Sequence, residues 1–172
     1  MKHLNKASLE TLIKSLMAEW AELNKEEEEK LRKVRYAGPS FDSKEYTAIM
    51  DAIFSNWWSG GSFSYNAEAK LASISDRKHG LLTNSGSSAN LVLMSAAKKL
   101  YFKDNDKILT LACGFPTTVN PIISNNLLPV FCDIDLNTLN LTPEKVKEAI
   151  SQHDIKGIFV AHTLGFNGEI DK

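Results

Sequence analysis

The second half of the chain alternates short apolar runs with helix-like segments, and this alternation limits the fold more than any other feature. The apolar runs lie at residues 80–83, 107–112, 128–133 and 155–162. Helical patterns lie between them, at residues 87–100, at residues 116–125 and from Thr142–Pro143 onward, where proline suits the first helical position. Strands joined through helices become parallel neighbours in one sheet. The sequence therefore predicts an α/β fold, a mostly parallel sheet with crossover helices.

A long amphipathic helix is predicted near the N-terminus, from Ser8 to about Val34. Its apolar residues recur at steps of three and four: Leu9, Leu12, Ile13, Leu16, Trp20 and Leu23. Ser8 is placed to cap this helix, an acidic run follows the apolar residues, and Gly38–Pro39 indicates a linker. We therefore expect an N-terminal acidic helix and linker at residues 1–40, and a second part at residues 41–172.

Two shorter helices are predicted before the alternating region. Asp42 and Glu45 have the spacing of a capping box, so a helix is expected to begin there and to end before two consecutive glycines. A third helix, at about residues 66–75, would turn Leu71 and Ile74 inward. The α/β part is therefore expected to be preceded by helices.

Composition and charge argue against several classes of function. The formal net charge is −1, so no bulk attraction to nucleic acid or to anionic membranes is expected. No apolar run approaches the length of a membrane span, and charged residues interrupt the first apolar segment, which argues against a secretory signal. Cys113 and Cys132 lack metal-binding spacing and are expected to be free thiols in a reducing cytoplasm.

The most informative stretch is a predicted strand followed by small hydroxyl residues and a helix. We call residues 84–88 the Ser/Gly loop. Gly86 lets the backbone turn sharply and approach a ligand closely. Ser87 and Ser88 place hydroxyls and unpaired N–H groups at the start of the helix, where the positive end of the helix dipole favours a phosphate. The loop fits neither a Walker motif nor GxGxxG. It indicates either a phosphate site or an ordinary helix cap.

A second stretch, residues 112–118, directly follows the next predicted strand. Ligands of open α/β sheets sit at the carboxyl ends of the strands, so this stretch and the Ser/Gly loop would share one edge. Phe115 is placed either to stack on a flat ligand near a phosphate or to fill the core. Cys113 has no evident histidine partner for nucleophilic chemistry and is interpreted as a small buried residue.

Three further polar residues follow predicted strands. His162 ends the last strand and is interpreted as a structural hydrogen-bonding residue rather than as a catalytic acid or base. Asp133 and Asp135 follow the preceding strand, and two carboxylates without further ligands are more typical of turn or helix caps than of a metal site. We therefore predict no metal site within the chain.

Two strings of residues, NSGSSANL at 84–91 and ACGFPTTVNPI at 112–122, resemble the sugar aminotransferase family of the DegT/DnrJ/EryC1/StrS type. The similarity continues through residues 128–135 to residues 161–165. Within the family, the strings are most similar to those of the CDP-4-keto-6-deoxyglucose 3-dehydrases. The resemblance covers roughly Trp57 to Gly165.

The resemblance implies the N-terminal part of a fold-type-I pyridoxal-phosphate-dependent transferase large domain, usually a homodimer. Gly86, Ser87 and Ser88 match the positions that hold the phosphate of pyridoxal 5′-phosphate or pyridoxamine 5′-phosphate. Phe115 matches the aromatic residue that stacks on the cofactor ring. The aspartate at the ring nitrogen, the catalytic lysine or histidine, and the cysteines of the [2Fe-2S] cluster of some dehydrases would all lie beyond Lys172.

The implied substrates are nucleotide-linked 4-keto-6-deoxy sugars of deoxysugar and lipopolysaccharide O-antigen synthesis. A lysine would make the complete enzyme an aminotransferase, and a histidine would make it a 3-dehydrase, a class in which some members use a reductase partner. After Gly165 the chain reads Phe-Asn-Gly, where the dehydrases are expected to read Asn-Pro-Phe. Two alternatives stay open: a non-catalytic fragment or remnant of such an enzyme, which alone would be inactive, and an unrelated phosphate-binding module.

Overall fold

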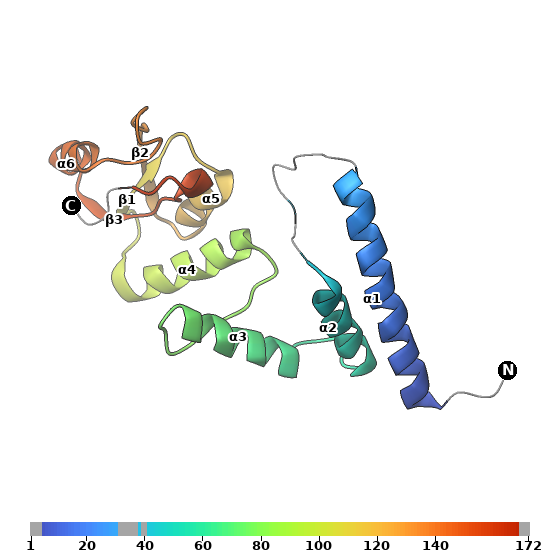
Figure 1. Ribbon diagram of the computed structural model, residues 1–172. Helices are drawn as coiled ribbons and strands as arrows, with labels where there is room; N and C mark the ends of the chain where they lie inside the picture. Colours follow the sequence, from blue (N-terminus) through green and yellow to red (C-terminus); the bar gives the residue numbers. More distant parts are fainter. Residues whose placement is uncertain (1–4, 31–37, 39–40, 169–172) are drawn as a thin grey trace. The chain divides into compact units, whose positions relative to one another are not determined.

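The computed structural model describes residues 5–30, 38 and 41–168 (Figure 1). The chain divides into two compact units, Met1–Leu81 (unit 1) and Leu82–Lys172 (unit 2), and each is described by itself. The boundary expected after residue 40 stays a prediction. Among the described residues, no helix is both long enough and apolar enough to cross a membrane.

Unit 1 begins with α1 (Lys6–Lys30), the long helix expected from the sequence. Its start differs from the prediction. The side-chain oxygen of Asn5 accepts a hydrogen bond from the Ser8 N–H at 2.9 Å, so Asn5 rather than Ser8 caps the helix. Ser8 lies inside the first turn because asparagine is an equally good cap and comes three residues earlier. The expected end at Val34 lies outside the described residues.

Helix α2 (Ser43–Phe54) has the capping box that the sequence predicts. The Asp42 carboxylate accepts from the Lys44 N–H at 2.7 Å. The Glu45 carboxylate in turn accepts from the Asp42 N–H at 2.7 Å. These two bonds satisfy N–H groups that have no partner inside the helix, and they fix where α2 begins.

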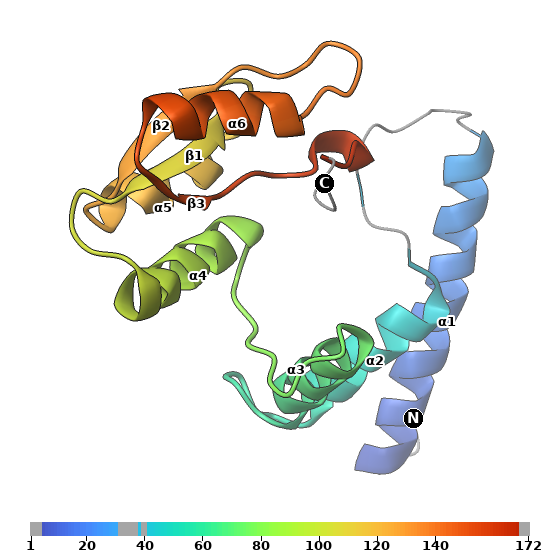
Figure 2. The same cartoon turned by 90° about the vertical axis from the view of Figure 1, so that its left-hand side faces the viewer.

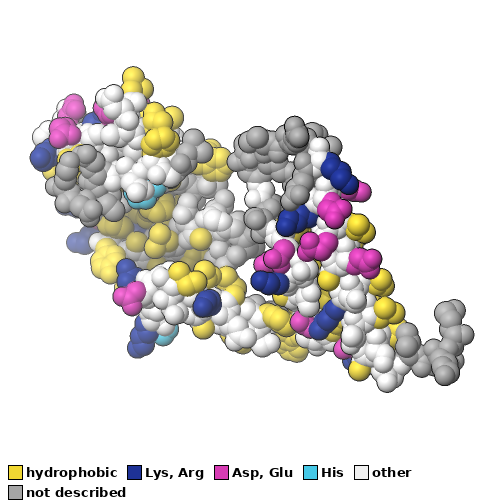
Figure 3. Space-filling view, viewed as in Figure 1, with side chains coloured by type: hydrophobic (Ala, Val, Ile, Leu, Met, Phe, Trp, Pro, Cys, Tyr) yellow, Lys and Arg dark blue, Asp and Glu magenta, His cyan; other side chains and the backbone are white. Residues whose placement is uncertain are grey.

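Helix α1 packs against α2, yet most of its apolar stripe is exposed. Ala21 is buried, Trp20 meets Tyr46 edge to face with ring centroids 5.4 Å apart, and Lys14 pairs with Asp51. Other large side chains of the stripe lie at the surface, where Figure 3 shows hydrophobic groups along α1: Leu9, Leu12, Ile13, Leu16 and Leu23. The contact with α2 therefore uses only one edge of the stripe.

Helix α3 (Ser62–Ile74) starts earlier than the sequence predicts. The expectation that Leu71 and Ile74 turn inward is wrong, because their side chains are 48% and 71% exposed. Ala72 is the buried residue of this helix. Apolar residues lie on more than one side of α3, so their periodicity alone does not select the buried side.

The described part of unit 2 contains a three-stranded parallel sheet with the order β2–β1–β3. Strand β1 (Lys107–Leu111) lies in the centre, between β2 (Leu128–Cys132) and β3 (Ile155–Ile158). Helix α5 (Pro116–Ser124) connects β1 to β2, and α6 (Pro143–Gln152) connects β2 to β3 (Figure 2). The predicted α/β arrangement with crossover helices is confirmed.

Helices cover both faces of this sheet. Ile108 clusters on one face with Met94 of α4 (Gly86–Tyr101). Leu109 clusters on the other face with Ala149 of α6. Successive side chains of a strand point to opposite faces, so β1 takes part in both cores.

Two expectations about strands are wrong. Residues 80–83 form no strand, because none of the three described strands pairs with them. Strand β3 ends at Ile158 rather than at His162. The N–H of Phe159 still donates to the Leu109 carbonyl at 2.9 Å, but the backbone then turns into a short 3-10 helix, η1 (Thr163–Gly165).

Candidate functional site

The sheet reverses its winding direction at β1, and this reversal marks a place for a ligand. The chain crosses from β1 to β2 on one side and then passes back over β1 to β3 on the other. Open α/β sheets bind ligands at such a switch point, outside the carboxyl ends of the strands. Two segments meet this description, residues 112–115 after β1 and residues 159–163 after β3.

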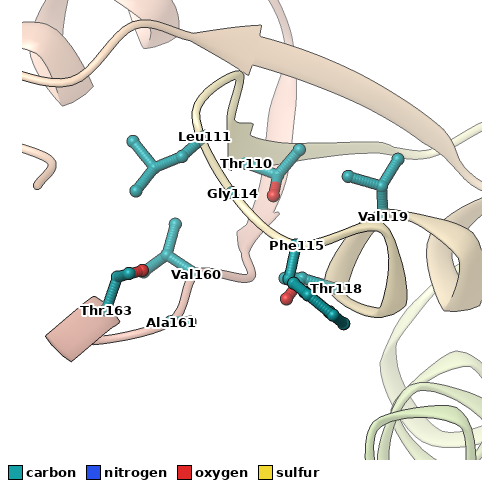
Figure 4. A pocket seen from close by; sticks show the side chains of 9 residues that line it. All are labelled: Thr110, Leu111, Gly114, Phe115, Thr118, Val119, Val160, Ala161 and Thr163. Carbon is teal, nitrogen blue, oxygen red and sulfur yellow. The ribbon is translucent and has the colours of Figure 1, made fainter. Parts of the chain in front are cut away.

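A small cavity of about 10 Å³ lies between these two segments (Figure 4). Its lining residues are Thr110, Leu111, Gly114, Phe115, Thr118 and Val119 on the β1 side, and Val160, Ala161 and Thr163 on the β3 side. A cavity of this size holds about one water molecule, so a larger ligand would lie over its mouth. Figure 4 shows the Phe115 ring beside Thr118 and turned away from Leu111.

The buried amide of Asn140 fixes the cavity wall on the β3 side. Its Nδ2 donates to the Ala161 carbonyl at 3.2 Å and to the Phe166 carbonyl at 2.7 Å. Its Oδ1 accepts from the Leu141 N–H at 2.8 Å, and the side chain is fully buried. The connection between β2 and α6 therefore holds the segment that follows β3. The sequence analysis did not identify this residue.

The Ser/Gly loop leads into α4 as predicted, and Ser85 is the residue that caps the helix. The Ser85 hydroxyl oxygen accepts from the Ser88 N–H at 3.2 Å and donates its proton to the Ser88 hydroxyl at 3.2 Å. The Ala89 N–H reaches the Ser85 carbonyl at 3.0 Å. The N–H groups of Gly86 and Ser87 therefore lie at the open end of the helix, where no carbonyl of the helix can accept from them.

The start of α4 fits an anionic group. Gly86 has no positive φ, so its backbone conformation does not depend on glycine here, and the expected close approach of a ligand to Gly86 stays a prediction. A Cβ built on Gly86 would meet nothing within 4 Å, which leaves open space at the helix end. Ser87 and Ser88 carry hydroxyls at the same end, beside two N–H donors and the positive end of the helix dipole. This donor set suits a phosphate.

The packing of α4 on α5 brings the two predicted segments together. The Nδ2 of Asn90, one turn after Gly86, donates to the Thr117 carbonyl at 3.2 Å. Helix α5 begins with Pro116 at its first position, so Phe115 occupies the N-cap position. The Ser/Gly loop and Phe115 therefore lie at the starts of two helices that pack on each other.

Phe115 is exposed within the described chain, with 68% of its surface accessible. The alternative that it fills the core is wrong, because the extended backbone at the N-cap of α5 turns the ring away from the end of β1. Cys113 is exposed too, so its interpretation as a buried residue is also wrong. Both residues lie in the segment that leaves the sheet after β1. The Phe115 ring is therefore accessible for stacking on a flat ligand.

The other polar candidates accept hydrogen bonds from backbone N–H groups. The Nδ1 of His162 accepts from a backbone N–H at 3.1 Å, and the Asp133 carboxylate accepts from the next N–H at 2.9 Å. The N–H groups of Asn137 and Thr138 donate to the Asp135 carboxylate at 2.8 Å and 3.1 Å, and these bonds lower the pKa of Asp135. The described residues contain no cluster of histidine, cysteine or acidic side chains that could hold a metal ion.

Comparison with known proteins relates most of the chain to one family. The model of the DegT/DnrJ/EryC1/StrS aminotransferase family matches residues 39–172. The chain is 40% identical over 134 residues to the lipopolysaccharide biosynthesis protein RfbH of Salmonella typhimurium, a match that covers 75% of this chain and 30% of that protein. It is 36% identical over 137 residues to a dTDP-4-dehydro-2,6-dideoxy-D-glucose 3-dehydratase of Saccharopolyspora spinosa, with 77% and 29% covered. The chain thus spans about 30% of the length of these relatives.

Solved structures give the same relationship at the level of the fold. A GDP-4-keto-6-deoxymannose-3-dehydratase with a trapped PLP–glutamate geminal diamine superposes with a TM-score of 0.64 and 33% sequence identity. The superposition covers 68% of this chain and 31% of that structure. The expected N-terminal part of a pyridoxal-phosphate-dependent transferase fold is confirmed.

Proposed function

The chain belongs to the DegT/DnrJ/EryC1/StrS aminotransferase family, and we propose that it forms the N-terminal part of an enzyme for nucleotide-linked 4-keto-6-deoxy sugars. The enzyme would use pyridoxal 5′-phosphate or pyridoxamine 5′-phosphate. The observation that carries the proposal is the pairing, within unit 2, of an anion-receptive helix start with an exposed aromatic ring. The names of the relatives support a role in deoxysugar and lipopolysaccharide synthesis.

The proposal gives each predicted site residue a role in holding the cofactor. Gly86 and Ser87 donate backbone N–H groups to the phosphate, at the positive end of the α4 dipole. The hydroxyls of Ser87 and Ser88 add further donors. Phe115 stacks on the ring and orients it over the carboxyl ends of β1 and β3.

The chemistry divides between the cofactor and the protein. When bound, the cofactor supplies an electron sink next to the sugar carbon whose bond breaks. The residues of this chain hold the phosphate and orient the ring. The aspartate at the ring nitrogen and the group that moves the proton are expected outside residues 1–172. A lysine in that role would specify an aminotransferase, and a histidine would specify a 3-dehydratase.

The assembly follows from the same proposal. The complete enzyme would be a cytoplasmic homodimer that binds a nucleotide sugar. A [2Fe-2S] cluster and a reductase partner would belong to it only if it is a 3-dehydratase. The chain of 172 residues by itself is expected to bind the cofactor without turning over sugar.

A titration of the chain with pyridoxamine 5′-phosphate tests the site, because this amine form reports non-covalent binding. Gly86→Asp places a carboxylate before the N–H groups and should weaken binding by about tenfold or more through charge repulsion. The helix should persist, since acidic residues favour helix starts. Fluorescence or calorimetry would give the dissociation constants.

Gly60→Asp is the matched control, because a Cβ at Gly60 also meets nothing within 4 Å. Its affinity for pyridoxamine 5′-phosphate should equal that of the wild type. Equal affinity in Gly86→Asp would reject the phosphate site. Inorganic phosphate bound as tightly as the cofactor would favour an unrelated phosphate-binding module, and no binding of either ligand would favour a remnant.

A further inference from the structure

Pro121 leaves a backbone acceptor of α5 without its usual donor. In an α-helix the N–H of each residue donates to the carbonyl four residues earlier, and proline has no N–H. Pro121 therefore cannot donate a hydrogen bond to the carbonyl of Thr117, four residues earlier. Pro121 is buried in α5, so the acceptor lies where the helix packs on the rest of unit 2.

The side chain of Asn90 supplies the missing donor. Its Nδ2 lies 3.2 Å from the Thr117 oxygen, across 27 residues of sequence. A carbonyl can only accept, so the amide must present its nitrogen rather than its oxygen to this partner. Pro121 thus frees the acceptor within α5, and Asn90 uses it to connect α4 with α5.

This hydrogen bond joins the two halves of the proposed cofactor site. Asn90 lies four residues after Gly86, a rise of about 6 Å along α4. Thr117 lies two residues after Phe115. The ring and the phosphate of the cofactor are joined by a short covalent linker. Both contacts can therefore form at once only when the starts of α4 and α5 keep a fixed separation.

We propose that Asn90 is a positioning residue that sets the distance between the phosphate-holding end of α4 and the Phe115 ring, through the acceptor that Pro121 leaves open. The inference rests on the proposed function, since it concerns the same site. It predicts that loss of Asn90 lowers the affinity for a ligand that spans both helix starts. A ligand that occupies only the start of α4 should bind as before.

The experiment compares two ligands on the full 172-residue chain. Asn90→Ala should weaken binding of pyridoxamine 5′-phosphate by about tenfold and change the affinity for inorganic phosphate by less than about twofold. Asn120→Ala removes an exposed asparagine of α5 and is the matched control, with both affinities unchanged. A role in general stability alone would lower both affinities of Asn90→Ala together.

A double-mutant cycle with Pro121→Ala separates positioning from stability. The N–H restored at position 121 can donate to the Thr117 carbonyl, so Asn90→Ala should lower the unfolding temperature less in this background. The loss of affinity for pyridoxamine 5′-phosphate caused by Asn90→Ala should be as large in the Pro121→Ala background as in the wild type. In the double variant the Thr117 carbonyl has a donor within α5, but no hydrogen bond connects it with α4. If Asn90→Ala does not fold in the wild-type background, the double variant compared with Pro121→Ala carries the affinity test.

The outcomes distinguish this inference from the proposed function. No binding of pyridoxamine 5′-phosphate by the wild type would overturn both. Binding by the wild type with unchanged affinity in Asn90→Ala would overturn the positioning role alone. Recovery of affinity along with stability in the Pro121→Ala background would overturn it too, because the bond would then act only by satisfying a backbone carbonyl.

Discussion

At the scale of single residues, the amide of Asn140 holds together segments that lie far apart in the sequence. Asn140→Ala removes the partner of the Ala161 and Phe166 carbonyls and of the Leu141 N–H. Each buried polar group left unsatisfied costs about 1–3 kcal/mol. The free energy of unfolding from urea titration is therefore expected to fall by roughly 3 kcal/mol or more.

The control for Asn140→Ala is Asn137→Ala, three residues earlier on the exposed side of the same connection. Surface substitutions of this kind usually stay within about 0.5 kcal/mol. A similar small effect of Asn140→Ala would mean that other groups or water replace its three hydrogen bonds.

The sequence indicated some residues of the proposed site and missed others for a physical reason. Residues 86–88 and Phe115 were indicated because they belong to short local strings placed at a helix start and after a strand, and their role in the site stays a prediction. Asn90 and Asn140 were not found, since their partners lie 27 and 21 residues away. One signal was present in the sequence: Pro121 inside a predicted helix shows that a carbonyl four residues earlier needs another donor.

At the scale of elements, the capping box of α2 makes unit 1 sensitive to acid. The Lys44 N–H donates to the Asp42 carboxylate and holds the pKa of Asp42 below its ordinary value. The resulting stabilisation is fully present above the ordinary carboxyl pKa near 4 and is lost as the pH falls through the lower folded-state pKa. The unfolding temperature of α2 should therefore drop as the solution is acidified below about pH 4.

Asp42→Asn isolates this effect, because asparagine caps a helix equally well and does not titrate. Thermal unfolding followed by far-UV circular dichroism should show a weaker dependence on pH below 4 in Asp42→Asn than in the wild type. An identical pH dependence in the two proteins would show that other carboxylates govern the acid response.

The elements themselves were predicted with uneven success. Strands β1 and β2 and helix α5 start where the sequence indicates. Asn105 and Asn126 have positive φ and turn the chain just before the two strands, and Pro116 occupies the first position of α5. Residues 80–83 were wrongly expected to be a strand, since an apolar run becomes a strand only beside a partner. Apolar residues lie on several sides of α3, so the sequence pattern could not predict that the side with Ala72 is the buried one.

At the scale of the whole molecule, both units expose much apolar surface. Leu100 and Tyr101 of α4 are 69% and 77% exposed, and the stripe on α1 adds to them. Exposed apolar surface of this extent promotes association. The 172-residue chain should therefore bind a hydrophobic dye and self-associate as its concentration rises, as measured by fluorescence and analytical ultracentrifugation. A chain that stays monomeric at all concentrations and does not increase the fluorescence of the dye would contradict this expectation.

The class of the fold could be predicted, but not its division into two units. Alternating apolar runs and helices indicated a parallel α/β arrangement, which the sheet confirms. The division after Leu81 depends on which helices pack together, with α1 on α2 in one unit and α4 on α5 in the other. The alternation of apolar runs and helices begins at residues 80–83, but this change of pattern does not say which helices pack together.

The central position of β1 has a consequence for how the chain is synthesised. The ribosome delivers β1 before either of its neighbours, since β2 and β3 both come later in the sequence. The emerging polypeptide therefore carries its most buried strand without any lateral partner until residue 132 has left the exit tunnel, and without its second partner until residue 158 has followed. Unpaired strand edges are the usual starting point of misassembly. Translation of residues 107–158 is thus the interval in which chaperones have most to protect.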